Sequence, residues 1–562
     1  MFLPTTKEEI DSFGWDELDV VLVSGDTYID SPYIGIAVIG NYLYDLGFRV
    51  GIIAQPKPLS EDIARLGEPK LFWGVSGGSV DSMVANYTAS KKRRKRDDYT
   101  PGGVNDRRPD RAVIAYTNLI KKHFKNTAPI VLGGLEASLR RIAHYDFWSN
   151  KIRRSILFDA KADILIYGMG ERAVGELAFS LKNKTSYKDI RGICYIDKEP
   201  KEGFIELPSF EEVGSSKDAY AKSFELFYEN NDPLNAKGLY QNSDSRYLIQ
   251  NPPAYHLSED ELDRVYELPY RRDIHPHYKR QGEVKALETI RFSITTHRGC
   301  YGECSFCAIA LHQGRAVLSR SQNSIIKEAE TITRLDGFKG YIDDVGGPTA
   351  NMYGYECEKK MTKGVCKNKP CIGVTKCKTM PISHKKQIEL LKELRGLDGV
   401  KKVFVRSGIR YDLILNDKIY GEKYLEEIVK HHISGQLKIA PEHTDESILE
   451  LMNKPDSATL LEFKKLYERL NTKNKKRQFL TYYFIAAHPG CDITQMQKLK
   501  NFTTSKLHSK PEQIQIFTPT PSTKSTLMYY TQKDPTTKKP LFVEKDMGKK
   551  LKQKDIFFKN SF

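Results

Sequence analysis

Three cysteines lie within eight residues of one another, at Cys300, Cys304 and Cys307, in the segment CYGECSFC. Thiolates this close can bind a metal, form a disulfide or fill a core. A structural zinc site takes four ligands, usually as two close pairs. Three thiolates in one loop instead suit three irons of a 4Fe–4S cube and leave the fourth iron open. Gly299 and Gly302 would let the loop wrap the cube and offer N–H groups to its sulfurs.

A second set of cysteines follows in a lysine-rich insert at residues 355–380: Cys357, Cys366, Cys371 and Cys377. Four ligands could hold a second iron–sulfur cluster or a structural zinc ion. The spacing is irregular and contains no C-x2-C pair, so a loop with incidental cysteines is the alternative. We treat the set as a candidate metal site, with iron–sulfur as the first choice and zinc as the second.

The chain has 562 residues, of which 40% are hydrophobic and 28% are charged, and this composition predicts two or more globular domains. The N-terminus does not resemble a signal peptide, and no stretch reaches the roughly 18 apolar residues of a membrane helix. Seven of the nine cysteines fall between positions 300 and 377, while Cys194 and Cys491 read as ordinary thiols. We expect a cytoplasmic protein whose clustered cysteines bind metal rather than form disulfides.

The formal net charge of +16 suggests an anionic partner such as RNA or DNA, although basic enzymes also reach such values. The sharpest basic run is KKRRKR at Lys91–Arg96, which we interpret as an exposed loop with solvated cations. A zinc-bearing nucleic-acid-binding protein is therefore an alternative of a different class.

The elements that position these residues fall into two regions. Before residue 199, apolar runs such as DVVLVSG, RVGIIAQ, KLFWGVSGG and PIVLGG alternate with helical patterns, which predicts a Rossmann-like, doubly wound parallel sheet. Glycines at the strand ends lie where such folds bind ligands, but none forms a G-x-G-x-x-G fingerprint. Residues 200–285 are rich in Asn, Asp, Tyr and Pro and read as an irregular connecting region.

The second region, residues 286–530, contains six strand candidates separated by helical patterns, which predicts a partial (β/α)6 barrel. The candidates are TIRFSITT, KGYIDDVGG, KKVFVRSGI, GQLKIAPEH, FLTYYFIAAHPG and PEQIQIFTPTP. The cysteine loop directly follows the first of them, on the face where barrel enzymes keep their active sites. A basic tail at 531–562 reads as a helix with a loose end.

The C-x3-C-x2-C motif, with Phe306 before its last cysteine, resembles the defining motif of the radical S-adenosylmethionine (SAM) superfamily. The segment DVGGP resembles the superfamily's glycine motif, which implies that the backbone of Gly346 and Gly347 contacts the methionine amino group. Pro348 stands where an acidic residue is usual, so only backbone contacts carry over. The segment VRSGIR implies polar SAM contacts from Ser407 and Arg410.

The chain resembles the YgiQ-like radical SAM proteins over residues 15–545, through segments such as HRGCYGECSFCAIALHQGR, GGPTANMYG and YYFIAAHPGC. This resemblance implies a cobalamin-binding-like N-terminal domain, a 4Fe–4S cluster that cleaves SAM to a 5′-deoxyadenosyl radical, and an electron donor such as flavodoxin or ferredoxin. Its substrate and reaction are undefined. The segment LKIAPEHTDESILELMNKP resembles methylthiotransferases, which makes an RNA-modifying enzyme the alternative.

A histidine motif often supplies the lower ligand of cobalamin, but the corresponding loop, SGDTYIDSPYIG, has no histidine. We therefore expect the fold without the cofactor, and binding without a protein ligand is the alternative. His443 and His488 end predicted strands and would face the active-site side, although a structural role is the more common outcome. Arg315 could meet a carboxylate of SAM, meet an anionic substrate or cap the cysteine loop.

Overall fold

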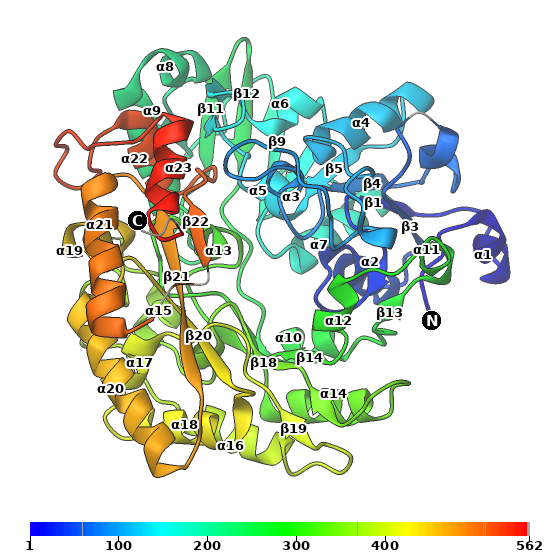
Figure 1. The fold of residues 1–562 in the computed structure, drawn as a ribbon. Coiled ribbons are helices and arrows are strands. Elements are labelled where there is room, and N and C mark those ends of the chain that lie inside the picture. Colours follow the sequence, from blue (N-terminus) through cyan, green and yellow to red (C-terminus); the bar gives the residue numbers. More distant parts are fainter. Residues whose placement is uncertain (59, 368, 510, 512, 559–562) are drawn as a thin grey trace. The chain divides into compact units, whose positions relative to one another are not determined.

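The computed structural model describes residues 1–562 except 59, 368, 510, 512 and 559–562. The chain divides into two compact units, Met1–Arg291 and Phe292–Phe562, which are described separately here (Figure 1). Among the described residues, no helix is long and apolar enough to cross a membrane.

The N-terminal unit is built on a nine-stranded sheet in the order β10-β11-β12-β9-β8-β5-β4-β1-β3. Five neighbouring strands are parallel, which confirms the predicted doubly wound class: β3 (Val50–Ala54), β1 (Val20–Ser24), β4 (Phe72–Ser76), β5 (Ile130–Gly133) and β8 (Ile164–Ile166). The chain moves from β1 to β3 on one side and then to β4 on the other. The topological switch therefore lies at the carboxyl end of β1.

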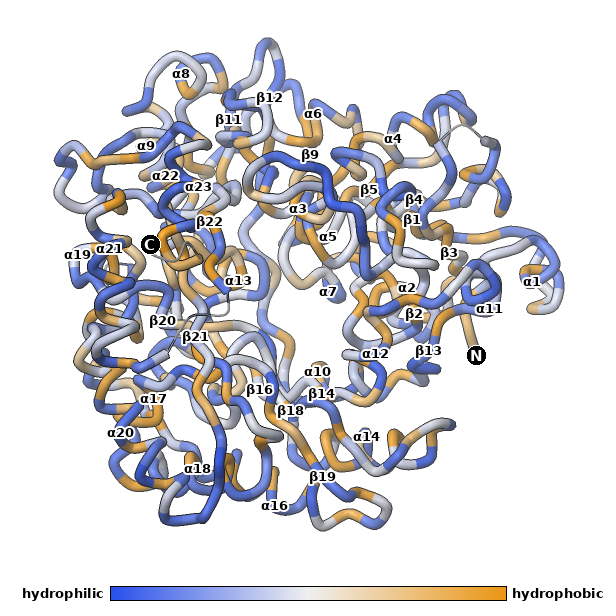
Figure 2. The backbone as a smooth tube through the Cα atoms, viewed as in Figure 1, coloured by the Kyte–Doolittle hydropathy of each residue, from blue (hydrophilic) through white to orange (hydrophobic). Residues whose placement is uncertain are grey.

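The apolar runs become buried strands because helices cover the sheet. Every residue of β1 and β3 is buried, as expected for parallel strands with both faces covered. The main helices are α2 (Gly35–Asp45), α4 (Ala112–His123) and α7 (Glu171–Lys182), and the core includes Leu43 of α2 and Val174 and Leu177 of α7. Figure 2 shows hydrophobic stretches along α2 and the neighbouring strands.

The structure corrects the prediction of an irregular region at residues 200–285. This segment contributes three strands to the sheet, β10 (Ile205–Leu207), β11 (Leu239–Ser243) and β12 (Arg246–Gln250), together with α8 (Phe210–Ser215), α9 (Lys217–Glu229) and α10 (Glu259–Glu267). β11 and β12 form an antiparallel hairpin, and β11 alternates buried and half-buried residues. The polar composition of the segment concealed this two-residue period, which is the sequence signal of a half-exposed strand.

In the C-terminal unit, each of the six strand candidates contains strand, and the predicted parallel α/β architecture is confirmed. β14 (Ser293–Thr295) pairs with β18 (Asp344–Gly346), β17 (Tyr341–Ile342) pairs with β19 (Lys402–Val403), and β20 (Gln436–Glu442), β21 (Phe479–Ala486) and β22 (Gln513–Ile516) form one ladder. All four of these pairings are parallel. Val345 N of β18 donates to Phe404 O, directly after β19, at 3.0 Å. This hydrogen bond joins the β14–β18 pair to the segment that follows β19.

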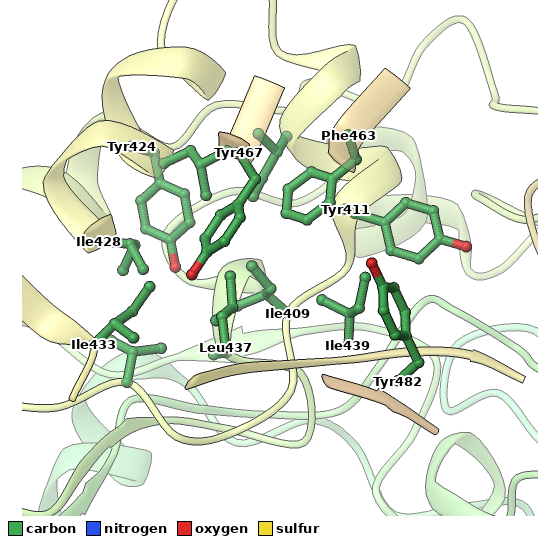
Figure 3. Packing of buried hydrophobic residues seen from close by; sticks show 14 of the residues in the cluster. Ile409, Tyr411, Tyr424, Ile428, Ile433, Leu437, Ile439, Phe463, Tyr467 and Tyr482 are labelled. Carbon is green, nitrogen blue, oxygen red and sulfur yellow. The ribbon is translucent and has the colours of Figure 1, made fainter. Parts of the chain in front are cut away.

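Amphipathic helices pack this second set of strands. They include α14 (Gln322–Thr333), α16 (Lys385–Leu394), α18 (Gly421–Glu427), α20 (Ser457–Lys473) and α21 (Ile493–Phe502). Figure 3 shows Phe463 and Tyr467 of α20 facing Leu437 and Ile439 of β20 across the core. In Figure 1, α20 and α21 run alongside β21, which supplies Tyr482 and Phe484 to the same core.

The basic tail contains the predicted helix. After α22 (Lys524–Thr531), the chain forms α23 (Met547–Asp555), where Lys550 is buried with its Nζ 3.0 Å from the hydroxyl of Tyr529. Phe557 enters the core of the C-terminal unit. The tail is therefore part of the C-terminal unit. Its lysines are spaced so that apolar and hydrogen-bonding residues lie together on the face that packs against the unit. The expected loose end at 559–562 lies outside the described residues.

Candidate functional site

The cysteine loop runs from β15 (His297–Arg298) to α13 (Ile309–His312). Backbone hydrogen bonds fix it: Cys300 N donates to Gly314 O at 3.2 Å, and Ser305 N donates to Met452 O at 3.0 Å. Gly299 has φ +84°, and a Cβ there would lie 1.9 Å from Ala316 O. Glycine is therefore required at the start of the loop by both its conformation and the close approach of the backbone.

The three thiols gather inside this loop. Gly302 N donates to Cys300 Sγ at 3.4 Å, and a guanidinium nitrogen of Arg410 donates to Cys304 Sγ at 3.5 Å. Burial, followed by the neighbouring thiols, raises the pKa of Cys300 and raises that of Cys307 to about 12. Without a metal, the two thiols are therefore protonated at neutral pH, and a metal that binds them would displace these protons.

This donor set fits an iron–sulfur cluster. Two of the three half-buried thiols, those of Cys300 and Cys304, receive N–H donors from the backbone and from a guanidinium. Such hydrogen bonds to sulfur tune Fe–S sites. Within the described residues, no group of three or more His, Cys, Asp or Glu side chains is placed to hold a single metal ion. A cube differs from such a site, because each of its cysteines ligates a different iron.

The predicted glycine motif lies beside the root of the cysteine loop. Gly346 is paired with Thr295 in the β14–β18 ladder, and its carbonyl accepts from Thr296 N at 2.7 Å. A Cβ on Gly347 would lie 2.6 Å from the ring of His297. The Oγ1 of Thr349, two residues further on, lies 3.8 Å from Cys300 Sγ. The tight packing behind Gly347 explains why this position excludes a side chain, and it brings the turn close to the thiols.

Ser407 and Arg410, both predicted to contact SAM, follow β19. The Ser407 hydroxyl donates to Asp344, whose other oxygen accepts from Ser407 N at 3.0 Å. This hydroxyl can therefore only accept a hydrogen bond from a ligand. Arg410 is clamped by Asp412, with Nε–Oδ1 and Nη2–Oδ2 distances of 2.8 and 2.6 Å. Arg410 is thus directed at the thiol of Cys304 while its Nε and Nη2 are held by Asp412.

Two residues that sequence reasoning missed help to fix this arrangement. Asn351 accepts from Arg410 N at 2.8 Å and donates to Arg410 O at 2.9 Å. Asp412 supplies the carboxylate described above, and the R-x-D spacing was a signal that could have identified it. The role of Asn351 had no such signal, because it depends on the packing of the turn after β18 against the turn after β19.

Phe306 is supported from the other side of the loop. Its ring lies edge-on to His488, with centroids 6.4 Å apart, and His488 Nε2 lies 2.7 Å from Ser525 Oγ. Ser525 N in turn donates to Ser305 O at 2.8 Å. Burial lowers the pKa of His488 to about 3, so the ring is neutral near pH 7. The structure thus gives His488 partners that fit a structural role.

His443 is satisfied in a similar way. Its Nδ1 accepts from Asp445 N at 2.9 Å, and its Nε2 lies 3.7 Å from the Cys491 thiol. Burial lowers the pKa of His443 to about 4. Arg315 lies against the cysteine loop, with its Nε 3.2 Å from Glu303 Oε1, which favours the capping role over contact with a ligand.

The second cysteine set is only partly assembled. Cys357, Cys371 and Cys377 pack with Cys300 against one small hydrophobic cluster that includes Tyr301, Met352 and Ile372. Cys366, in contrast, is exposed. The amide of Asn453 donates to the carbonyls of Gly302, Glu303 and Ile372 and so joins the insert to the cysteine loop. The second metal site therefore stays a prediction, with three of its four cysteines gathered near the first site.

The carboxyl edge of the N-terminal sheet is the other place where a ligand is expected. There, the guanidinium of Arg108 lies 2.7 Å from Asp26 Oδ1 and 3.0 Å from Asp97 Oδ2, and all three residues are buried. A Cβ on Gly25 would lie 2.1 Å from Gly77 O, so the ends of β1 and β4 almost touch. The side chains of the unit itself fill the topological switch point.

Comparisons with known proteins agree with these features. The family model described as Radical SAM N-terminal matches residues 2–293. The UPF0313 protein FN0734 of Fusobacterium nucleatum subsp. nucleatum is 57% identical over 557 residues, covering 99% of this chain and 98% of the relative. A UPF0313 protein of Thermotoga petrophila is 50% identical over 564 residues, covering 100% and 99%.

Among solved structures, the chain is similar to OxsB, described as a cobalamin-dependent S-adenosylmethionine radical enzyme with aqua-cobalamin and S-adenosylmethionine bound. The TM-score is 0.50 at 13% sequence identity, and the match covers 92% of this chain and 55% of OxsB. This likeness shows the fold alone.

Proposed function

The chain belongs to the UPF0313 family of radical SAM proteins, and we propose that this enzyme binds a 4Fe–4S cluster through Cys300, Cys304 and Cys307 to cleave SAM reductively. The observation that carries the proposal is the gathering of three half-buried thiols at a strand end, beside the Gly346–Gly347 turn. A bound cluster would supply the electron that breaks the sulfonium bond and the open iron that orients SAM.

The residues of the chain have distinct parts in this proposal. The three thiolates hold the cluster, and the donors of Gly302 and Arg410 stabilise the charge on their sulfurs. The Gly346–Gly347 turn presents backbone groups to the amino group of SAM, and the Ser407 oxygen accepts a further hydrogen bond. Phe306 and its packing against His488 exclude water from one side of the loop.

The test is anaerobic reconstitution with iron and sulfide, followed by measurement of 5′-deoxyadenosine formed from SAM with a flavodoxin or ferredoxin donor. We expect about four irons and four sulfides per chain and SAM-dependent product. Replacing Cys300, Cys304 or Cys307 with Ala should abolish both. The matched control is Cys194→Ala, a buried cysteine of the N-terminal unit, which should retain both. Continued SAM cleavage in the triple variant would overturn the assignment.

The same measurement addresses the second cysteine set. About eight irons per chain, falling to about four after replacement of Cys357, Cys371 and Cys377, would identify a second iron–sulfur cluster. Zinc bound beside four irons would identify a structural zinc site. Zinc in the absence of iron and sulfide would instead favour the alternative of a zinc-bearing nucleic-acid-binding protein.

For the substrate, we favour RNA. The support is the net charge of +16 and the methylthiotransferase-like segment around β20. Mass spectrometry of RNA from cells with and without this enzyme should show one modification that disappears in its absence. Because a thiolate-bound cluster needs a reducing compartment, we place the reaction in the cytoplasm.

We also propose that the N-terminal unit takes no cobalamin, although OxsB is described as cobalamin-dependent. The support is the buried Arg108 network at the switch point, together with the absence of histidine from residues 24–35. Anaerobic mixing of the full chain with hydroxocobalamin, followed by gel filtration, should leave the corrinoid absorbance in the small-molecule fractions. Stoichiometric co-elution with the protein would refute this proposal.

A further inference from the structure

The basic run Lys91–Arg96 is exposed at all six positions, as expected, yet its backbone is held in a hairpin. Tyr87 and Arg93 form an isolated antiparallel bridge, and Arg94 N donates to Asn86 O at 2.7 Å. Asn105 N donates to Lys95 O at 3.2 Å on the following stretch. A fixed backbone lowers the entropic cost of presenting these charges to a partner.

Most of this charge is not neutralised by the protein. Arg93 pairs with Asp110 at 3.6 Å. Across the described part of the chain, Lys92, Lys95 and Arg96 make no ion pair with a carboxylate. Three outward-facing cations therefore remain available on one ordered hairpin.

Aromatic rings lie beside two other cations of the same run, Lys91 and Arg93. Trp148, at the turn between β6 (His144–Asp146) and β7 (Lys151–Arg153), is half-buried, and its ring lies 5.7 Å from that of Tyr87, which is also half-buried. Lys91 Nζ donates to Trp148 O at 3.2 Å and lies over the Phe147 ring at 4.7 Å. These contacts join the two hairpins, which together carry exposed cations and half-buried aromatic rings.

We propose that the surface formed by Tyr87, Lys92, Lys95, Arg96 and Trp148, the basic–aromatic surface, binds a single-stranded polynucleotide. Cations on an ordered backbone suit the phosphates, and half-exposed aromatic rings suit the faces of unpaired bases. Bases in a duplex are stacked on one another and cannot reach a tryptophan ring. This inference rests on the RNA-directed function proposed above for its biological use, but binding and SAM cleavage are measured separately.

The experiment is fluorescence anisotropy of the full, reconstituted chain with a labelled 20-nucleotide single-stranded RNA at several salt concentrations. The same strand as DNA, its duplex, and inorganic polyphosphate serve as parallel probes. We expect both single strands to bind more tightly than the duplex, and polyphosphate to compete poorly at high salt. Equal binding of single strand, duplex and polyphosphate would overturn the proposal in favour of a charge-only surface.

The charge variant is Lys92→Glu, Lys95→Glu and Arg96→Glu combined. It should weaken binding roughly a hundredfold at 0.1 M salt and lower the log–log salt slope by about 2, since each phosphate contact on a single strand contributes about 0.7. The matched control combines Lys122→Glu, Lys125→Glu and Lys198→Glu, three exposed lysines of the same unit. Equal loss in the control would show that net charge alone acts and would overturn the assignment of this surface.

Trp148 separates stacking from charge. Trp148→Ala should weaken RNA binding about tenfold at 0.2 M salt, where Trp148→Phe should retain it, because phenylalanine can still stack. RNA should quench tryptophan fluorescence in the parent chain but not in Trp148→Phe. Binding unchanged in Trp148→Ala would refute the aromatic role. SAM cleavage without RNA should be unchanged in every variant, so a loss of cleavage would point to the first proposal instead.

Discussion

At the carboxyl end of the parallel strands in the N-terminal unit, the functional groups pair with one another. Arg108 bridges Asp26 and Asp97, and Arg140 pairs with Asp81 beside Glu136. At the equivalent end in the C-terminal unit, three thiols lie together, and their partners include N–H donors and the Thr349 hydroxyl rather than ion pairs. The same type of sheet edge is thus closed by ion pairs in one unit and lined with thiols, the candidate metal ligands, in the other.

This difference has a physical reason. Buried charges are stable only when paired, so an arginine inserted between two carboxylates fixes the edge of the sheet and leaves no group for a ligand. Neutral thiols are tolerated in a buried loop and become charged only as a metal replaces their protons. A ligand site at a strand end therefore requires side chains, such as thiols, that stay neutral until the ligand binds.

The largest effect is expected from breaking the closed edge. Arg108→Met should leave Asp26 and Asp97 buried without a cation and lower the free energy of unfolding by about 3–5 kcal/mol. Chemical denaturation measures the loss in the free energy of unfolding. Hydrogen exchange in peptides of β1 and β4 shows whether the loss is located at this edge of the sheet. Arg93→Met, which removes an exposed arginine, should cost less than about 0.5 kcal/mol. Equal stability of the two variants would contradict the comparison.

Acid should affect the two units unequally. Burial lowers the pKa to about 4 for His144 in the N-terminal unit and for His297 and His443 in the C-terminal unit, and to about 3 for His488. Below about pH 6.5, these histidines bind protons in the unfolded chain but remain neutral in the folded chain. Each histidine's stabilising effect is therefore complete above pH 6.5, and about 2 kcal/mol of it is lost by pH 5.

Hydrogen exchange of the apo chain at pH 7 and pH 5 tests this inequality. Protection should fall more in peptides of β20 and β21 than in those of β1 and β5. His488→Gln should reduce the acid sensitivity of β21, because glutamine does not titrate, while the control His123→Gln, a less buried histidine, should not. A larger loss of protection in the N-terminal unit would show that carboxylates, rather than histidines, govern the acid response.

A smaller effect is expected at the open edge. Asp412→Asn should loosen Arg410 beside Cys304 and lower the rate of 5′-deoxyadenosine formation by about tenfold. The iron content after desalting should fall in parallel, since the residue acts by positioning Arg410. Asp398→Asn, on an exposed loop of the same unit, is the control. An unchanged rate and iron content would remove Arg410 from the description of the site.

The smallest effect concerns the link between the two cysteine sets. Asn453→Ala removes the hydrogen bonds that one amide shares among three backbone carbonyls and should cost about 1 kcal/mol of unfolding free energy. If the link also orders the metal site, the variant should bind iron at a lower rate during reconstitution. Normal iron uptake with reduced stability would assign Asn453 to packing alone.

Much of the fold was predictable because burial leaves a strong pattern. The parallel strands β1, β3 and β4 are continuous apolar runs, and the strands of the C-terminal unit alternate with amphipathic helices at regular intervals. The strands of the hairpin at 239–250 were missed because only alternate residues of β11 face the core. Their polar residues dominate the composition and conceal the periodicity.

The sequence by itself determined the chemistry of the candidate site, since the three cysteines, their glycines and Phe306 lie within one short segment. Only the tertiary structure decided what surrounds them. Arg410 reaches Cys304 from more than 100 positions away, and Asn351 and Asp412 direct it there. Local spacing can specify ligands on one loop, but the direction of a long side chain depends on partners that packing alone brings together.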